Sequence, residues 1–66
     1  MREYEVTFQV FNDDGSSETK AVRVIAGNIK LATIRAMSEI NKIPGYSDLF
    51  KKLYSVEEVK MEVIRK

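Results

Sequence analysis

The sequence contains no cysteine and no histidine, and these two absences exclude several kinds of protein. Without cysteine no disulfide framework can form. Without either residue there is no Ser-His or Cys-His catalytic pair, and the usual nitrogen and sulfur ligands of zinc are missing. Carboxylates could still act as acid and base, but Asp13 and Asp14 lie in a turn sequence and Glu57 and Glu58 are adjacent, so neither pair is held across a pocket. The sequence therefore predicts a protein that is not an enzyme, with no cofactor and no metal site.

Long apolar segments are also missing. The opening "MREYEVTFQV" alternates polar and apolar residues and lacks the continuous apolar stretch of a signal peptide. No later segment approaches the length needed to cross a bilayer. We therefore expect a cytoplasmic protein without a membrane partner.

The charge balance is nearly even, with 11 basic and 10 acidic residues and a net charge of +1. Dedicated nucleic-acid binders carry a much larger basic excess. The hydrophobic fraction of 44% and the charged fraction of 32% are ordinary for a folded domain. The 66 residues predict a single domain, 1–66, close to the smallest size at which a hydrophobic core suffices.

Two alternating stretches predict a β-hairpin. Residues Glu3 to Phe11 alternate with a period of two, and a second alternating stretch runs from Thr19 to Ile25 after the turn sequence "NDDGSSE". The residues expected to face the core are Tyr4, Val6, Phe8, Val10, Val22 and Val24. We expect the first strand in the middle of the sheet and the second and third strands at its edges.

The segment Ile29 to Asn41 predicts a helix, because it is rich in helix formers and follows Asn28, a good N-cap. One stripe of this helix is expected to cover the sheet: Ile29, Ala32, Thr33, Ala36, Met37 and Ile40. Leu31 and Ile34 lie outside that stripe and need another neighbour.

The stretch "IPGYSDLFKKLYS", residues 43–55, supplies that neighbour as a predicted short second helix. Its apolar residues recur at helical spacing: Tyr46, Leu49, Phe50, Leu53 and Tyr54. The alternating "VEEVKMEVIRK" then predicts a third strand. The predicted fold is α+β: a β-hairpin, a helix, a short helix and a β-strand, with the helices on one face of a three-stranded sheet.

The hairpin, the helix and the "INKIP" turn resemble the first half of the ubiquitin-like β-grasp fold. The resemblance is one of element order over about two thirds of the chain, and it carries no specific motif. The ending "EVIRK" has no Gly-Gly tail, so the resemblance does not imply a conjugated modifier.

The face of the sheet away from the helices is the main candidate binding surface. It is mostly polar but also carries outward apolar residues, the usual composition of a protein interface. The candidate partner-binding residues are Phe11, Arg23, Ile25, Glu62 and Ile64. We expect a protein-binding module that acts through this face or an edge strand. It would be a homodimer or a small regulator or inhibitor of the kind encoded by phages and mobile elements.

Two alternatives remain open. Basic and aromatic side chains near the second helix could bind single-stranded nucleic acid: Lys42, Tyr46, Lys51 and Lys52. Asn28 and Lys30 at the start of the first helix could bind an anion.

Overall fold

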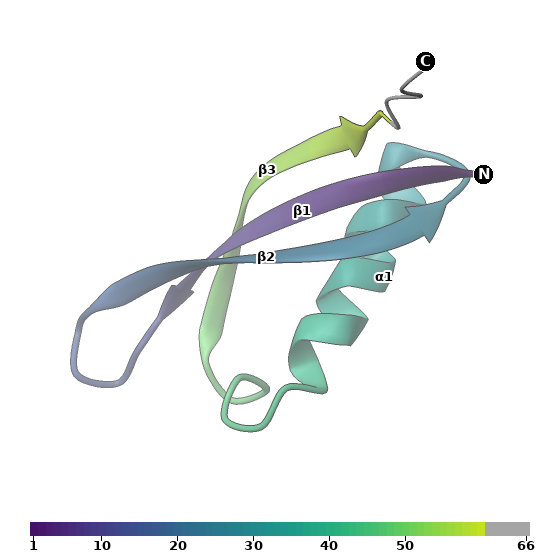
Figure 1. Ribbon diagram of the computed structural model, residues 1–66. Helices are drawn as coiled ribbons and strands as arrows, with labels where there is room; N and C mark the ends of the chain where they lie inside the picture. Colours follow the sequence, from purple (N-terminus) through teal and green to yellow (C-terminus); the bar gives the residue numbers. More distant parts are fainter. Residues whose placement is uncertain (61–66) are drawn as a thin grey trace, which may run out of the picture.

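The computed structural model describes residues 1–60 as one helix and three strands (Figure 1). The elements are β1 (Arg2–Phe11), β2 (Ser17–Ala26), α1 (Ile29–Asn41) and β3 (Phe50–Val59). The predicted α+β class with a three-stranded sheet is confirmed. Among these residues no helix has the length and apolar character needed to cross a membrane.

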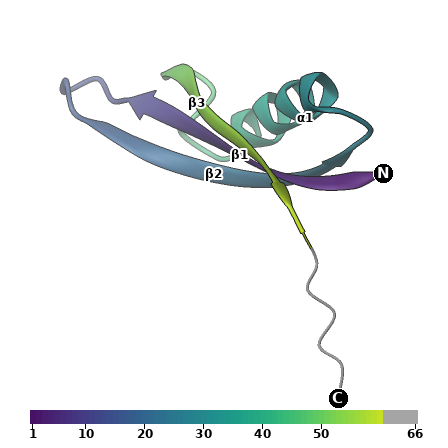
Figure 2. The same ribbon diagram turned by 90° about the horizontal axis from the view of Figure 1, so that it is seen from above.

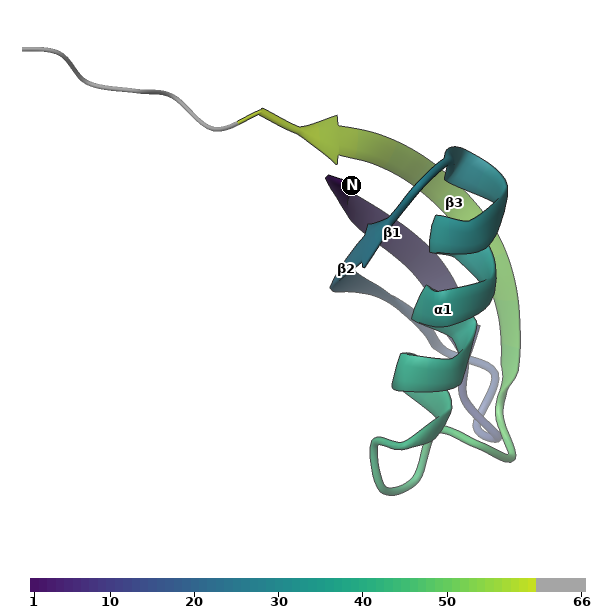
Figure 3. The ribbon, with the colours of Figure 1, turned by 90° about the vertical axis from the view of Figure 1, so that its right-hand side faces the viewer.

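β1 lies in the middle of the sheet, as the sequence predicted, because the strand order is β2-β1-β3 (Figure 3). Both neighbours run antiparallel to β1. Val6 lies opposite Val22 on one side and Val56 on the other. Since directly opposite residues share a face, this pairing brings apolar side chains of all three strands together beneath α1.

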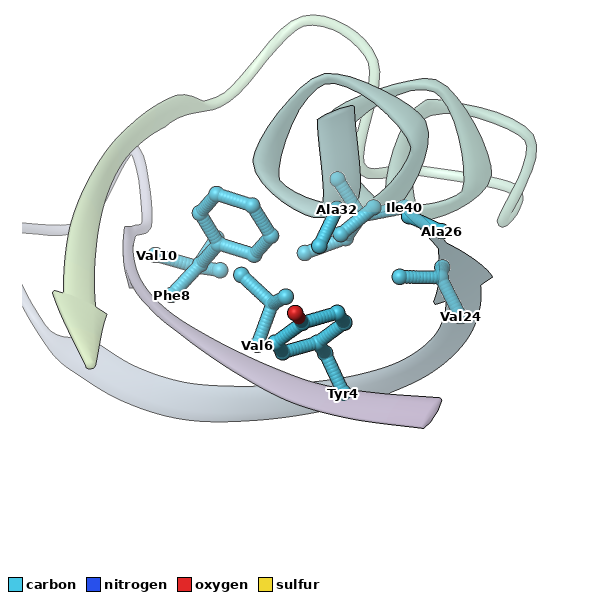
Figure 4. Packing of buried hydrophobic residues seen from close by; sticks show 9 residues of the cluster. Tyr4, Val6, Phe8, Val10, Val24, Ala26, Ala32 and Ile40 are labelled. Carbon is cyan, nitrogen blue, oxygen red and sulfur yellow. The ribbon is translucent and has the colours of Figure 1, made fainter. Parts of the chain in front are cut away.

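α1 covers one face of the sheet, and no described helix or strand covers the opposite face (Figure 2). Alternate β1 residues form the floor of the core and are almost completely buried, as predicted. Ala32 and Ala36 are also buried, and their small side chains let the helix approach the sheet closely. The core residues are Tyr4, Val6, Phe8, Val10, Val24, Ala26, Ala32, Ala36 and Ile40 (Figure 4).

The predicted second helix is absent, and this part of the prediction was wrong. Residues 44–48 form turns, and Gly45 has a φ of +89° that disfavours other residue types. Tyr46 N–H donates to the Ile43 carbonyl, and Leu49 N–H donates to the Tyr46 carbonyl, both at 3.1 Å. These turns bring the chain back to β1, where a strand of ten residues gains ladder hydrogen bonds along most of its length, whereas an isolated two-turn helix is marginal in stability.

β3 therefore begins at Phe50, earlier than the predicted third strand, and residues 61–66 of that prediction lie outside the described part. Its ladder with β1 contains a β-bulge: Ser55 lies opposite Thr7 and Leu53 lies opposite Phe8, so Tyr54 has no opposite residue. Because no second helix covers them, Leu31 and Ile34 of α1 stay exposed, at 42% and 58%.

Candidate functional site

The sheet face away from α1, here called the open face, presents alternate residues of all three strands. Its middle is polar, and Glu5 there accepts from Arg23 Nε at 3.4 Å across the β1–β2 ladder. Lys52 and Glu57 of β3 lie opposite Gln9 and Glu5 of β1. Apolar side chains gather instead at the two ends of this face.

The aromatic end of the open face consists of Phe11 and Phe50, which lie directly opposite each other on β1 and β3. Their ring centroids are 5.6 Å apart and their planes are tilted by 47°, within the range of favourable aromatic pairs. Phe11 is half-buried, whereas Phe50 is 68% exposed. A large apolar surface is therefore held in place and left in contact with water.

The aliphatic end of the open face consists of Met1, Ile25 and Val59. Ile25 and Val59 lie opposite Glu3 on the two sides of β1, and Ile25 is 58% exposed. Together with Met1 they line a shallow hollow whose other walls are charged: Arg2, Glu3, Glu58 and Lys60. The result is a small apolar surface with a charged rim.

The structure places three of the five predicted partner-binding residues. Ile25 lies at the aliphatic end of the open face, Arg23 lies in its polar middle, and Phe11 faces the same way at the opposite end. Phe11 and Ile25 therefore do not form one patch within a single chain. Glu62 and Ile64 lie outside the described residues.

Phe50 is the open-face residue that the sequence prediction missed, because it was assigned to the buried stripe of the second helix. Only the antiparallel pairing of β3 with β1 brings it beside Phe11. The available sequence signal was the abundance of aromatic and β-branched residues in "FKKLYSVEEV", a composition typical of strands.

The four candidate nucleic-acid residues do not share one surface. Lys42 follows α1 and pairs with Glu39 at 3.5 Å. Lys51 Nζ donates to the Tyr46 and Leu49 carbonyls at 2.6 and 2.7 Å, while Lys52 lies on the open face. Tyr46 is half-buried against the core, so its ring is only partly available for stacking on a base.

Asn28 and Lys30, the candidate anion-binding residues, lie at the start of α1. Asn28 Oδ1 accepts from the Leu31 N–H at 2.9 Å, which confirms Asn28 as the N-cap. This bond already uses one of the N–H groups at the start of α1 that could otherwise bind an anion. Both residues line a shallow surface hollow with Arg2, Tyr4, Ile29 and Glu58.

Asp14 of the hairpin turn has a structural role. Asp14 accepts from Ser16 Oγ at 2.6 Å and from the Ser16 N–H at 2.9 Å. These bonds favour the charged carboxylate and lower the pKa of Asp14. Within residues 1–60 no three acidic, histidine or cysteine side chains are grouped to hold a metal ion.

No protein-family model matches this chain, and no curated protein or solved structure is significantly similar to it. The resemblance to the β-grasp fold and the predicted binding functions therefore stay predictions.

Proposed function

We propose that this chain is a non-catalytic module that binds another protein through the open face of its sheet. The observation that carries the proposal is Phe50, which is 68% exposed and held against Phe11 on a face that no described helix or strand covers. Exposed aromatic side chains in an ordered setting are typical anchors of protein interfaces.

The arrangement of this face supports protein binding on energetic grounds. Phe50 is already oriented by Phe11, so burying its ring costs little conformational entropy. The neighbouring Lys52 and the central pair of Arg23 and Glu5 provide polar groups that can orient a partner. An apolar anchor beside charged groups gives both affinity and specificity.

The arrangement of the helix and the sheet also favours protein binding. Within residues 1–60, one helix over one sheet face leaves little room for a deep pocket of the kind that holds small substrates. The open face is instead broad and carries its exposed side chains at fixed strand positions. Such a surface suits a small regulator or inhibitor that acts by covering part of a partner protein's surface.

The experiment compares the proteins that the immobilised chain captures with those captured by a Phe50→Ser variant. The matched control is Ile34→Ser, because Ile34 is similarly exposed at 58% but lies on α1. We expect partners retained by wild type and by the control to be lost with Phe50→Ser. If all three chains capture the same proteins, the open face is not the binding surface.

The nucleic-acid alternative is separated from this proposal by salt. Phosphate contacts weaken steeply as salt rises, whereas an apolar anchor is much less sensitive. We expect no binding of a labelled single-stranded oligonucleotide at low salt. Salt-sensitive binding that Phe50→Ser leaves unchanged, together with no specific protein capture, would contradict the proposal and favour the alternative.

A further inference from the structure

We infer that the outer edge of β3 pairs with the β3 strand of a second copy of this chain, forming a two-fold dimer with a continuous six-stranded sheet. One part of the inference rests on the proposed function: the open face is the surface that the dimer would present to a partner protein. Its own evidence is the edge position, the charge order and the bulge of β3.

β3 is a ten-residue edge strand. Among the described residues it pairs only with β1, so the backbone groups on its other side have no strand partner. Such an edge is a template for adding another strand. The opposite edge strand, β2, is partly engaged by the helix, because Arg35 donates to the Ile25 carbonyl at 2.6 Å.

The charges of β3 are ordered so that the strand complements itself. In "FKKLYSVEEV" two lysines precede the centre of the strand and two glutamates follow it. Antiparallel pairing of two copies about the centre, between Tyr54 and Ser55, would set each lysine opposite a glutamate, Phe50 and Leu53 opposite valines, and Tyr54 opposite Ser55. The facing pairs are Lys51 with Glu58, Lys52 with Glu57, Leu53 with Val56, and Phe50 with Val59. Parallel in-register pairing would instead place like charges together.

The β-bulge makes the faces of this self-pairing agree. In a regular strand, side chains on one face are separated by even numbers of residues, so Leu53 and Val56 would point to opposite faces. The bulge at Tyr54 removes this conflict, because Leu53 lies opposite Phe8 and Val56 lies opposite Val6, both core residues of β1. In each of the four facing pairs named above, both residues therefore point to the same face of the sheet.

Of the two facing charge pairs, Lys52 with Glu57 on the open face is the one most available to a second copy. Among the described residues Lys52 and Glu57 are exposed and have no ion pair, and Glu57 lies opposite another acidic residue, Glu5. A second copy would bring Lys52 to Glu57. On the other face Lys51 bonds to two carbonyls and Glu58 lies 3.8 Å from Arg2, so those residues already have partners within the chain.

The dimer would also join the two apolar ends of the open face. Phe50, next to Phe11 in one chain, would face Val59 of the second copy, which lies in the same row as that copy's Ile25. Apolar ends that are separated by the length of β1 in one chain would become neighbours across the two-fold axis. The dimer would thus offer a partner two larger apolar patches.

The experiment measures mass in solution by analytical ultracentrifugation over a range of concentrations. We expect wild type to reach twice the chain mass of 7.6 kDa. Lys52→Glu and Glu57→Lys should each weaken self-association at least about tenfold, because each places two like-charged pairs in the dimer. Lys30→Glu, an equal charge change on α1, should leave it unchanged. Circular dichroism checks that every variant is folded.

The decisive step mixes the two weakened variants in equal amounts. A Lys52→Glu chain facing a Glu57→Lys chain has opposite charges in both open-face pairs, so the mixture should regain the dimer mass. A wild type that stays at 7.6 kDa, variants that dimerise as well as wild type, or a mixture that stays monomeric would each overturn the inference.

The experiments distinguish a failure of the proposed dimer from a failure of the proposed function. A monomeric wild type that still captures a protein through Phe50 overturns the dimer and leaves the proposed function standing. A dimer that responds to the charge variants, but whose captured proteins do not depend on Phe50, supports the dimer and contradicts the proposed function.

Discussion

At the scale of single residues, similar side chains have opposite roles because of the face on which they lie. Phe8 is fully buried beneath α1, whereas Phe50 is 68% exposed on the open face. The alternation of β1 predicted the first of these positions, since every second residue of a strand points to the same side. Composition alone does not distinguish the two.

The two phenylalanines should therefore respond differently to truncation. Phe8→Ala should lower the free energy of unfolding by about 3–5 kcal/mol, a large part of the roughly 3–10 kcal/mol expected for a domain of this size. Phe50→Ala should change it by less than about 1 kcal/mol. Urea unfolding followed by circular dichroism measures both values, and equal losses would contradict the face assignment.

The hairpin turn should respond to pH through Asp14. The hydrogen bonds from Ser16 lower the pKa of Asp14 below its ordinary value of 3.8, so they stabilise the folded state above that pH. This contribution is lost as the pH falls through the lower pKa of the folded state. Ser16→Ala should raise the pKa of Asp14, while Ser17→Ala should not. NMR titration of the Asp14 carboxyl carbon measures the pKa, and an unchanged value in Ser16→Ala would contradict this role.

At the scale of elements, the regular parts of the chain were predictable and the irregular part was not. The helix Ile29–Asn41 and its Asn28 cap, the hairpin and the central position of β1 all follow local patterns. β3 does not, because the bulge at Tyr54 breaks its alternation. The apolar residues of this stretch instead fall at helical spacing: Tyr46, Leu49, Phe50, Leu53 and Tyr54. Pairing with a distant strand overrides that local signal.

The turn between α1 and β3 sets where β3 begins, and Gly45 is central to it. Its φ of +89° lies in the region that L-residues rarely adopt, although an added Cβ would meet no atom within 4 Å. Gly45→Ala should therefore lower the free energy of unfolding by about 1–2 kcal/mol through backbone strain alone.

Gly27 provides the matched control for this substitution. A Cβ there would also meet no atom within 4 Å, but its φ is not in the positive region. Gly27→Ala should leave stability nearly unchanged or raise it slightly. Urea unfolding distinguishes the two variants, and equal effects would show that the turn does not depend on the conformation of Gly45.

At the scale of the whole molecule, the fold is one-sided. α1 covers β1 and β2 on one face, and no described helix or strand covers the other face (Figure 2). Phe50 and Ile25 at the two ends of that face are exposed. The sequence predicted this one-sidedness and the outward positions of Phe11 and Ile25. The pairing of Phe50 with Phe11, and the self-complementary outer edge of β3, depend on where β3 begins and how it pairs with β1. Those features follow from long-range pairing rather than from any local pattern.

Residues 50–59 form a strand antiparallel to β1, and both the open-face anchor and the dimer edge depend on this pairing. Backbone NOE spectroscopy of the isotope-labelled chain tests this directly. We expect cross-strand contacts that follow the pairing of Val6 with Val56, Thr7 with Ser55 and Phe8 with Leu53, with the bulge at Tyr54. Contacts between residues three apart through 47–54, with no contacts to β1, would indicate a helix there and contradict the account.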